Sequence, residues 1–205
     1  MLDFITSLFR RPWAPKTFVY QLQGTNLSSL HSCQADVKVV AASIDPTAVR
    51  GTVFAHLSIR GENLPYLHRC MAEIINAGFD GVVLAHGEED VETLHDLSAN
   101  ARRAKPSFKL LSHGGLNLIG KGNFNALIDG VIADSVMIRD GKLRYLHDCN
   151  KDLRTLKSLG KPTFIIEYGV PRAHMEMVKY AAKANGSLLL TLDDDKFNKL
   201  VVSAT

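Results

Sequence analysis

Gly78-Phe79-Asp80-Gly81-Val82-Val83-Leu84-Ala85-His86 decides how this chain folds. Gly78 follows an amphipathic segment, at the place where a glycine commonly ends a helix. The apolar run that follows is typical of a short strand buried on both faces, as in parallel sheets. The stretch therefore predicts a helix end, a tight turn and a strand. At the end of that strand, where an enzyme could use a carboxylate, the chain has the methyl group of Ala85 and the imidazole of His86.

The same alternation of a short β-rich run and a longer helical run continues along the chain. We expect strands at 18–24, 37–44, 52–59, 81–85, 108–112, 130–133, 163–168 and 187–191. We expect helices at 63–76, 89–104, 149–159, 171–186 and 196–202. Eight strands, most of them followed by a helix, favour parallel pairing through right-handed crossovers. The prediction is an α/β fold, a compact (β/α)8 TIM barrel with a short N-terminal helix.

The connection between the second and third strands leaves the fold open to an alternative, and the N-terminus leaves its own role open. Residues 45–51 are too few for a crossover helix, so an open doubly wound sheet is the alternative fold. We expect residues 1–16 to form an N-terminal arm and 17–205 to form the barrel domain. The apolar residues within 1–11 have helical spacing, which indicates a packed helix or a weak contact with a membrane or a protein. No apolar run reaches the length of about 20 that spans a bilayer, and no signal peptide is recognisable, so we expect a cytoplasmic protein.

The composition describes a folded globular protein and narrows its partners. The 205 residues suffice for one domain with a substantial core, and 46% of them are hydrophobic. The net charge of +3 is weak, and no stripe of Lys and Arg with interleaved aromatic residues appears, so we expect no nucleic-acid partner. Three widely spaced cysteines, Cys33, Cys70 and Cys149, fit neither a disulfide framework nor a zinc knuckle. We expect no metal and no cofactor, because His86 and His113 lack a third ligand at metal spacing.

Polar side chains gather at the predicted strand ends, which form the active face of such a barrel. The candidate catalytic residues are Asp134, Glu167, Glu88 and His86, and the candidate substrate-binding residues are Gln21, Gln23, Asp45, Ser58, His113 and Tyr168. Asp134 and Glu167 end neighbouring strands, where two carboxylates could share one substrate. Paired carboxylates suit the hydrolysis of a glycosidic bond. Each acid could instead cap a helix or join a salt bridge.

Five stretches, together with Asp134-Ser135, carry a resemblance. They are 19–24 (VYQLQG), 55–59 (AHLSI), 77–84 (AGFDGVVL), 128–131 (IDGV) and 160–168 (GKPTFIIEY). In this order and spacing they resemble the glycoside-hydrolase-like TIM barrels that include the endo-α-1,4-polygalactosaminidases. The resemblance implies a sugar-binding cleft and two catalytic acids, on the fourth and sixth strands. The sixth-strand acid maps onto Asp134, where the family more often has glutamate, and the fourth-strand aspartate maps onto Ala85 and is absent.

Two further positions depart from the family. Its glycine-glutamate after the third strand reads here as Arg60-Gly61-Glu62, and the asparagine common after the fifth strand is replaced by His113. The sequence then favours a catalytically degenerate sugar-binding or regulatory module, with a carbohydrate or another small molecule as ligand. The alternative is an active glycosidase on aminosugar polymers that uses Asp134 with Glu167 or Glu88. A role in assembly through residues 1–11 is compatible with either.

Overall fold

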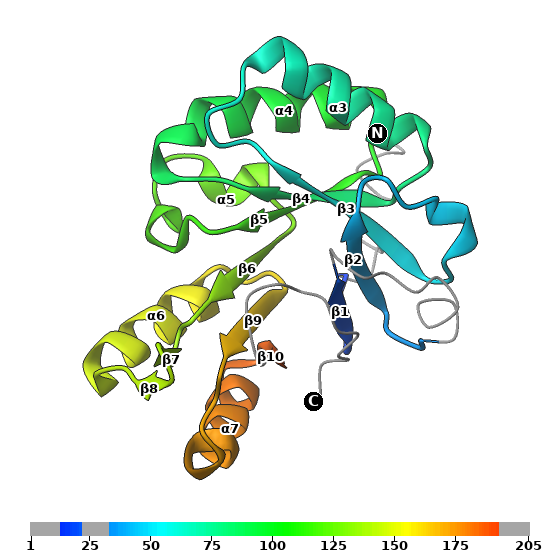
Figure 1. Ribbon diagram of the computed structural model, residues 1–205. Helices are drawn as coiled ribbons and strands as arrows, with labels where there is room; N and C mark the ends of the chain where they lie inside the picture. The colour runs from blue at the N-terminus through cyan, green and yellow to red at the C-terminus, as the bar shows by residue number, and fades with distance from the viewer. Residues whose placement is uncertain (1–12, 22–32, 193–205) are drawn as a thin grey trace, which may run out of the picture.

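The computed structural model describes residues 13–21 and 33–192. Eight parallel strands form one sheet in the order β1-β2-β3-β4-β5-β6-β9-β10. The sheet curls until β1 and β10 come into contact, which gives a nearly closed barrel (Figure 1). A doubly wound sheet would reverse its strand order at a switch point, whereas these strands follow the chain. The predicted TIM barrel is confirmed, and the alternative of an open doubly wound sheet is wrong.

The eight strands lie within a few residues of their predicted positions. They are β1 (Phe18–Gln21), β2 (Val37–Ala41), β3 (Thr52–Ser58), β4 (Gly81–Ala85), β5 (Lys109–His113), β6 (Gly130–Asp134), β9 (Thr163–Tyr168) and β10 (Leu188–Leu192). All neighbours in the sheet pair in parallel. Their carboxyl ends therefore meet at one rim of the barrel.

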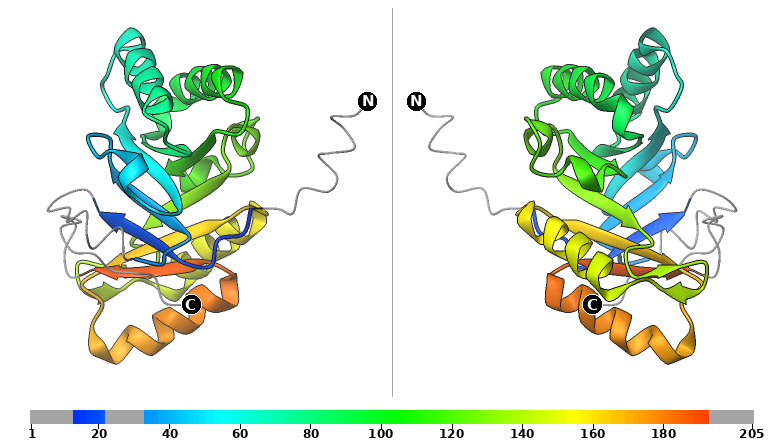
Figure 2. Two further views of the ribbon diagram at one scale, coloured as in Figure 1. Left: turned by 90° about the vertical axis from the view of Figure 1, so that its right-hand side faces the viewer. Right: turned by 90° about the vertical axis from the view of Figure 1, so that its left-hand side faces the viewer.

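Helices cover the outside of the sheet (Figures 1 and 2). They are α3 (Leu64–Asn76), α4 (Val91–Ala104), α5 (Phe124–Leu127), α6 (Leu146–Ser158) and α7 (Met175–Asn185). Asn63 caps α3 by accepting a hydrogen bond from the Tyr66 N–H at 3.0 Å. In the described ranges, no helix combines the length and the apolar character needed to cross a membrane. The expected N-terminal helix and the helix at 196–202 lie outside the described residues.

Two connections differ from the usual helix. β2 and β3 are joined through the single-turn 3-10 helix η1 (Pro46–Ala48), which suffices because the two strands are neighbours in the barrel. Between β6 and α6 the chain forms an antiparallel hairpin, β7 (Ile138–Arg139) and β8 (Lys142–Leu143), which the sequence analysis did not predict. Its turn is Asp140-Gly141, with φ of 52° and 68°, the Asp-Gly pair that two-residue hairpins favour.

The side chains of each strand alternate between two apolar layers. Those that point into the barrel are Phe18, Tyr20, Val37, Val39, Phe54, Val83, Leu111, Ile132, Phe164, Ile166, Leu190 and Leu192. The alternate positions, such as Val82, Leu110 and Ile165, pack outward with the helices. A residue therefore faces the barrel interior or the helices according to its parity along the strand.

Aspartates tie the starts of neighbouring strands together at the other rim. Asp80, just before β4, accepts a hydrogen bond from the Val53 N–H of β3 at 2.9 Å. Asp129, just before β6, accepts one from the Leu110 N–H of β5 at the same distance. Asp36, just before β2, accepts from the Thr17 N–H ahead of β1 at 3.2 Å. The aspartates of the Asp-Gly pairs at 80–81 and 129–130 thus join neighbouring strands of the barrel wall.

Trp13 covers the barrel interior at this rim. Its ring stacks on Phe54 with 5.7 Å between ring centroids and lies 6.3 Å from Phe164. The Lys109 ammonium lies 5.1 Å from the Trp13 ring centroid, a cation–π contact. The inner layer below Trp13 is filled by Phe18, whose ring meets Phe164 edge to face at 4.9 Å. The end of the barrel opposite the strand carboxyl ends is therefore closed by aromatic packing.

Gly81→Ala tests the packing at the start of β4. A Cβ at this position would lie 2.3 Å from the Phe54 ring and 2.5 Å from the Lys109 carbonyl oxygen, so the barrel wall must shift. We expect a loss of about 2–3 kcal/mol in the free energy of unfolding, measured by denaturant titration. Gly186→Ala is the control: its Cβ would meet no atom within 4 Å, and only the left-handed φ of 78° opposes it, at about 1 kcal/mol. Equal losses in the two variants would contradict this account.

Candidate active site

Five polar or aromatic side chains face the barrel interior at the carboxyl ends of its strands. They are Tyr20 on β1, His56 on β3, His113 on β5, Asp134 on β6 and Tyr168 on β9. Each shares the parity of an inner-layer residue two positions earlier on its strand, such as Ile132 for Asp134. The methyl group of Ala85 occupies the corresponding inward position on β4. These residues form the candidate active site.

Four of these residues form one hydrogen-bonded chain. The Tyr20 hydroxyl lies 2.9 Å from Nδ1 of His113, and Nε2 of His113 lies 2.6 Å from Oδ2 of Asp134. The Tyr168 hydroxyl donates to Oδ1 of Asp134 at 3.2 Å. The Asp134 side chain is 37% exposed and that of His113 is 13% exposed. A small molecule in the mouth can therefore reach Asp134 more readily than His113.

The Asp134 carboxylate sets the direction of this hydrogen-bonded chain, because it can only accept. Nε2 of His113 therefore carries a proton and donates to Asp134. In the neutral ring Nδ1 is then the acceptor for the Tyr20 hydroxyl. Desolvation raises the pKa of Tyr20 well above its ordinary value, and the charges of Asp134 and Tyr168 add to the effect, so the phenol stays protonated. The Asp134 carboxylate consequently has two hydrogen-bond donors, which hold both of its oxygens in place.

His56 lies beside these four residues, and no side chain or backbone group within residues 13–21 and 33–192 hydrogen-bonds to its ring nitrogens. Its ring centroid lies 6.0 Å from that of Tyr20 and 6.4 Å from that of His113, edge to face in both cases. Desolvation is the main cause that lowers the pKa of His56 to about 4, and the charge of the nearby His113 adds to it. The imidazole is thus neutral at physiological pH and can donate a hydrogen bond from one nitrogen. Our sequence analysis missed both His56 and Tyr20, although the two-residue period along 18–21 and 52–58 places them with the inward-facing residues.

Glu167 and His86, two predicted catalytic residues, face the helices and not the barrel interior. Glu167 is fully buried, and its carboxylate accepts hydrogen bonds from the Met137 and Ile138 N–H groups at 2.8 and 2.9 Å. The buried His86 ring lies 2.7 Å, through Nε2, from the Ser112 hydroxyl. The expected pairing of Asp134 with Glu167 is wrong, because the two side chains lie on opposite faces of the barrel wall.

Some of the other predicted residues lie in the candidate active site and some lie elsewhere. Asp45 caps η1, since its Oδ1 accepts from the Thr47 N–H at 2.9 Å and from the Thr47 hydroxyl at 2.7 Å. Those bonds lower its pKa. Gln21 is buried on the outward-facing side of β1. Ser58 follows the inward-facing positions Phe54 and His56 and is exposed at the end of β3. Gln23 lies outside the described residues. His113 and Tyr168, by contrast, join Asp134 as described above.

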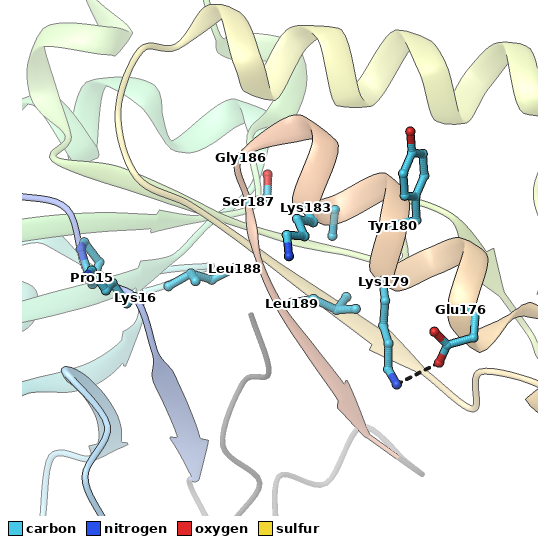
Figure 3. A pocket seen from close by; sticks show the side chains of 11 residues that line it. Pro15, Lys16, Glu176, Lys179, Tyr180, Lys183, Gly186, Ser187, Leu188 and Leu189 are labelled. Atoms are coloured by element: carbon cyan, nitrogen blue, oxygen red, sulfur yellow. Dashed lines mark hydrogen bonds and ion pairs between the residues drawn. The ribbon is translucent and has the colours of Figure 1, made fainter.

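Grooves also lie outside the mouth, on the described surface. Glu88, the exposed first residue of the 3-10 helix η2 (Glu88–Asp90), lines a groove of about 490 Å³ with Asn117, Lys121 and Lys151. A second groove, of about 570 Å³, runs between α7, the start of β10 and Lys16 ahead of β1 (Figure 3). Neither contains a residue of the hydrogen-bonded chain. Within residues 13–21 and 33–192, no three His, Cys, Asp or Glu side chains are grouped to hold a metal ion.

Comparison with known proteins shows the fold alone. No family model matches the sequence, and no curated protein matches it. CutC from Streptococcus agalactiae is similar in structure, with a TM-score of 0.56 at 12% identity over 85% of this chain and 96% of that one. Oxaloacetate acetylhydrolase in complex with oxalate gives 0.56 at 12% identity, over 89% of this chain and 76% of that one. Citrate synthase SbnG gives 0.55 at 12% identity, over 85% and 86%.

The resemblance to the glycoside-hydrolase-like barrels is wrong. The similar structures named above are CutC, oxaloacetate acetylhydrolase and citrate synthase barrels, and none of these is a glycoside hydrolase. The physical reason lies in the quoted stretches themselves, because Asp80-Gly81 and Asp129-Gly130 tie and pack the barrel wall. Such pairs report how a barrel closes and carry no information about sugars. The carbohydrate function expected from the resemblance, degenerate or active, is wrong with it.

His56→Phe tests the environment of the inner imidazole. The pKa of His56 is lower in the folded protein, so the unfolded chain binds a proton first as the pH falls. Its contribution to stability is complete above about pH 6.5 and is lost between there and about pH 4. We expect the variant to lose about 1–3 kcal/mol less than wild type over this interval, measured by urea unfolding at each pH. His147→Phe, at an exposed position on α6, is the control and should follow the wild-type curve.

Proposed function

We propose that this protein is an enzyme that transfers a proton on a small carbonyl compound bound at the barrel mouth. One observation carries the proposal: a carboxylate held by two donors, Asp134, belongs to the same inner layer as the neutral imidazole of His56. A base beside a neutral hydrogen-bond donor is the combination that enolisation requires. The position of both groups at the carboxyl ends of barrel strands supports the proposal.

The proposed step uses groups of this chain only. The Asp134 carboxylate removes a proton from the carbon next to the carbonyl group, so that a C–H bond breaks and an O–H bond forms on Asp134. The electron pair moves to the carbonyl oxygen, which becomes an enolate and accepts a hydrogen bond from the His56 N–H. Return of the proton to the same carbon re-forms the C–H bond and completes hydrogen exchange. If a substituent on the next carbon departs first, taking its bonding electron pair while the enolate electrons form a C=C bond, the result is an elimination, a lyase reaction.

His113 and Tyr20 support Asp134 in this step. The Nε2–H of His113 stabilises the ionised carboxylate before it accepts the proton, and Tyr20 holds the tautomer that makes this donation possible. Tyr168 fixes the other oxygen. These two bonds orient one lone-pair direction of Asp134 toward the mouth, which is the requirement for a positioned base.

The fold relatives suggest the first compounds to test. One fold hosts many chemistries, so the likeness supports the choice of panel and nothing finer. Oxaloacetate acetylhydrolase with bound oxalate and citrate synthase SbnG share the barrel. Small 2-oxo acids combine a carbonyl group with acidic C–H bonds and are therefore the starting class.

The test is deuterium incorporation into pyruvate, 2-oxobutyrate and 2-oxoglutarate in D₂O, followed by proton NMR. We expect at least one compound to exchange faster with the protein than without it. Asp134→Asn should reduce the accelerated rate at least about 100-fold, because it removes the base. Asp140→Asn is the matched control: it makes the same chemical change on the exposed hairpin turn, where a φ of 52° also suits asparagine.

Two outcomes would contradict the proposal. The first is exchange no faster than the protein-free rate for every compound of the panel. The second is an accelerated rate that Asp134→Asn and Asp140→Asn leave equally unchanged. A rate that falls in His56→Phe and in Asp134→Asn, with Asp140→Asn at the wild-type value, is the expected pattern.

A further inference from the structure

Two consecutive residues of β9 hold Asp134 from opposite sides of the barrel wall. Tyr168 points inward and donates its hydroxyl to Oδ1 of Asp134. Glu167 points outward, is fully buried, and binds the backbone that follows Asp134. Its Oε1 accepts from the Met137 N–H at 2.8 Å and its Oε2 from the Ile138 N–H at 2.9 Å. Both carboxylate oxygens of Glu167 are therefore used to bind one short segment of chain.

That segment begins with a strained turn, which is stabilised by groups from other parts of the chain. Ser135, directly after Asp134, has a φ of 51°, a left-handed conformation that costs a non-glycine residue about 1 kcal/mol. The Ser135 N–H donates to the Ile166 carbonyl of β9 at 2.9 Å. Arg144 donates to the carbonyl oxygens of Ser135 and Val136 at 3.1 and 2.7 Å. The strained turn persists because Arg144 on one side and Glu167 further along fix its backbone.

We propose that Glu167 is a positioning residue of the candidate active site: its buried carboxylate fixes the turn after β6 and thereby sets the direction of the Asp134 side chain. The inference rests on the proposed function in one respect, that Asp134 is the reacting group. Glu167 does not contact the mouth and acts through the backbone of residues 135–138. A misplacement of about 1 Å at a reacting group can cost on the order of 100-fold in rate, so such control matters.

The charge of Glu167 makes this control depend on pH. Desolvation raises the pKa of Glu167 to about 7, although the backbone N–H groups of Met137, Ile138 and Val136 and the charge of Arg144 act in the opposite direction. The neighbouring titratable groups are Cys149 and Asp152 of α6, and Asp152 pairs with Arg144 at 2.8 Å. Protonation leaves the carboxyl one strong acceptor for two N–H donors. The turn is therefore held most firmly above about pH 7.

The experiment follows the turn itself and does not require a substrate. In wild type, the amide signals of Met137 and Ile138 should titrate with a midpoint near pH 7, and the Asp134 carboxyl carbon should show an inflection at the same pH. In Glu167→Gln both inflections should disappear, because the amide does not ionise. The side-chain NH₂ of glutamine also faces one backbone donor, so the Asp134 signal should shift at every pH.

Glu176→Gln on α7 is the matched control, since Glu176 is exposed and pairs with Lys179 at 3.0 Å, away from the turn. It should retain both inflections. If exchange activity is found, Glu167→Gln should lower its kcat about 10- to 100-fold with little change in KM. Because the His113 imidazole also contacts Asp134, the Asp134 inflection is assigned to Glu167 only if it persists in His113→Gln. That variant leaves Glu167 in place, so a failure of Glu167→Gln to fold does not prevent the test.

The outcomes separate this inference from the proposed function. An Asp134 signal that shows no inflection with the Met137 and Ile138 amides overturns the positioning role, whatever the activity. Shared inflections in a protein without exchange activity support the positioning role and count against the proposed function alone. Shared inflections together with a lowered kcat in Glu167→Gln support both.

Discussion

The alternation of side chains along parallel strands is the constraint on which the rest of this structure depends. Because every strand is buried on both faces, a residue either fills the barrel or meets the helices, and no position serves both. Asp134 and His113 are on the inner face, while their neighbours Ala133 and Ser112 are on the outer face. The chemistry at the mouth is therefore limited to one residue in two at each strand end.

The pattern of apolar runs predicted the eight strands and favoured the barrel, with an open doubly wound sheet left as the alternative. Strand and helix positions follow from hydrophobic periodicity, and the order of strands follows from their parallel pairing. The Asp140-Gly141 turn also carried a hairpin signal, but two-residue strands such as Ile138–Arg139 are too short to show a period. The glycoside-hydrolase resemblance was wrong, and two of its motifs, Asp80-Gly81 and Asp129-Gly130, serve the packing of the barrel wall.

The candidate site was only partly predictable. Asp134, His113 and Tyr168 were expected at the rim where the strand ends meet, and hydrogen bonds join His113 and Tyr168 to Asp134 there. Glu167 was placed with them because position along the chain was considered without parity, and one residue of offset moves a side chain to the other face of the wall. Which oxygen contacts which hydrogen, as in the chain from Tyr20 to Asp134, depends on rotamers that no sequence pattern encodes.

The aromatic packing around Trp13 limits how a small molecule can enter the barrel. With Phe54, Phe164 and Lys109 packed against that ring, the lower end offers no passage to a dissolved compound. Any molecule that reaches Asp134 must arrive and depart across the same rim. Under the proposed function, substrate and product would therefore exchange across the rim at the strand carboxyl ends alone.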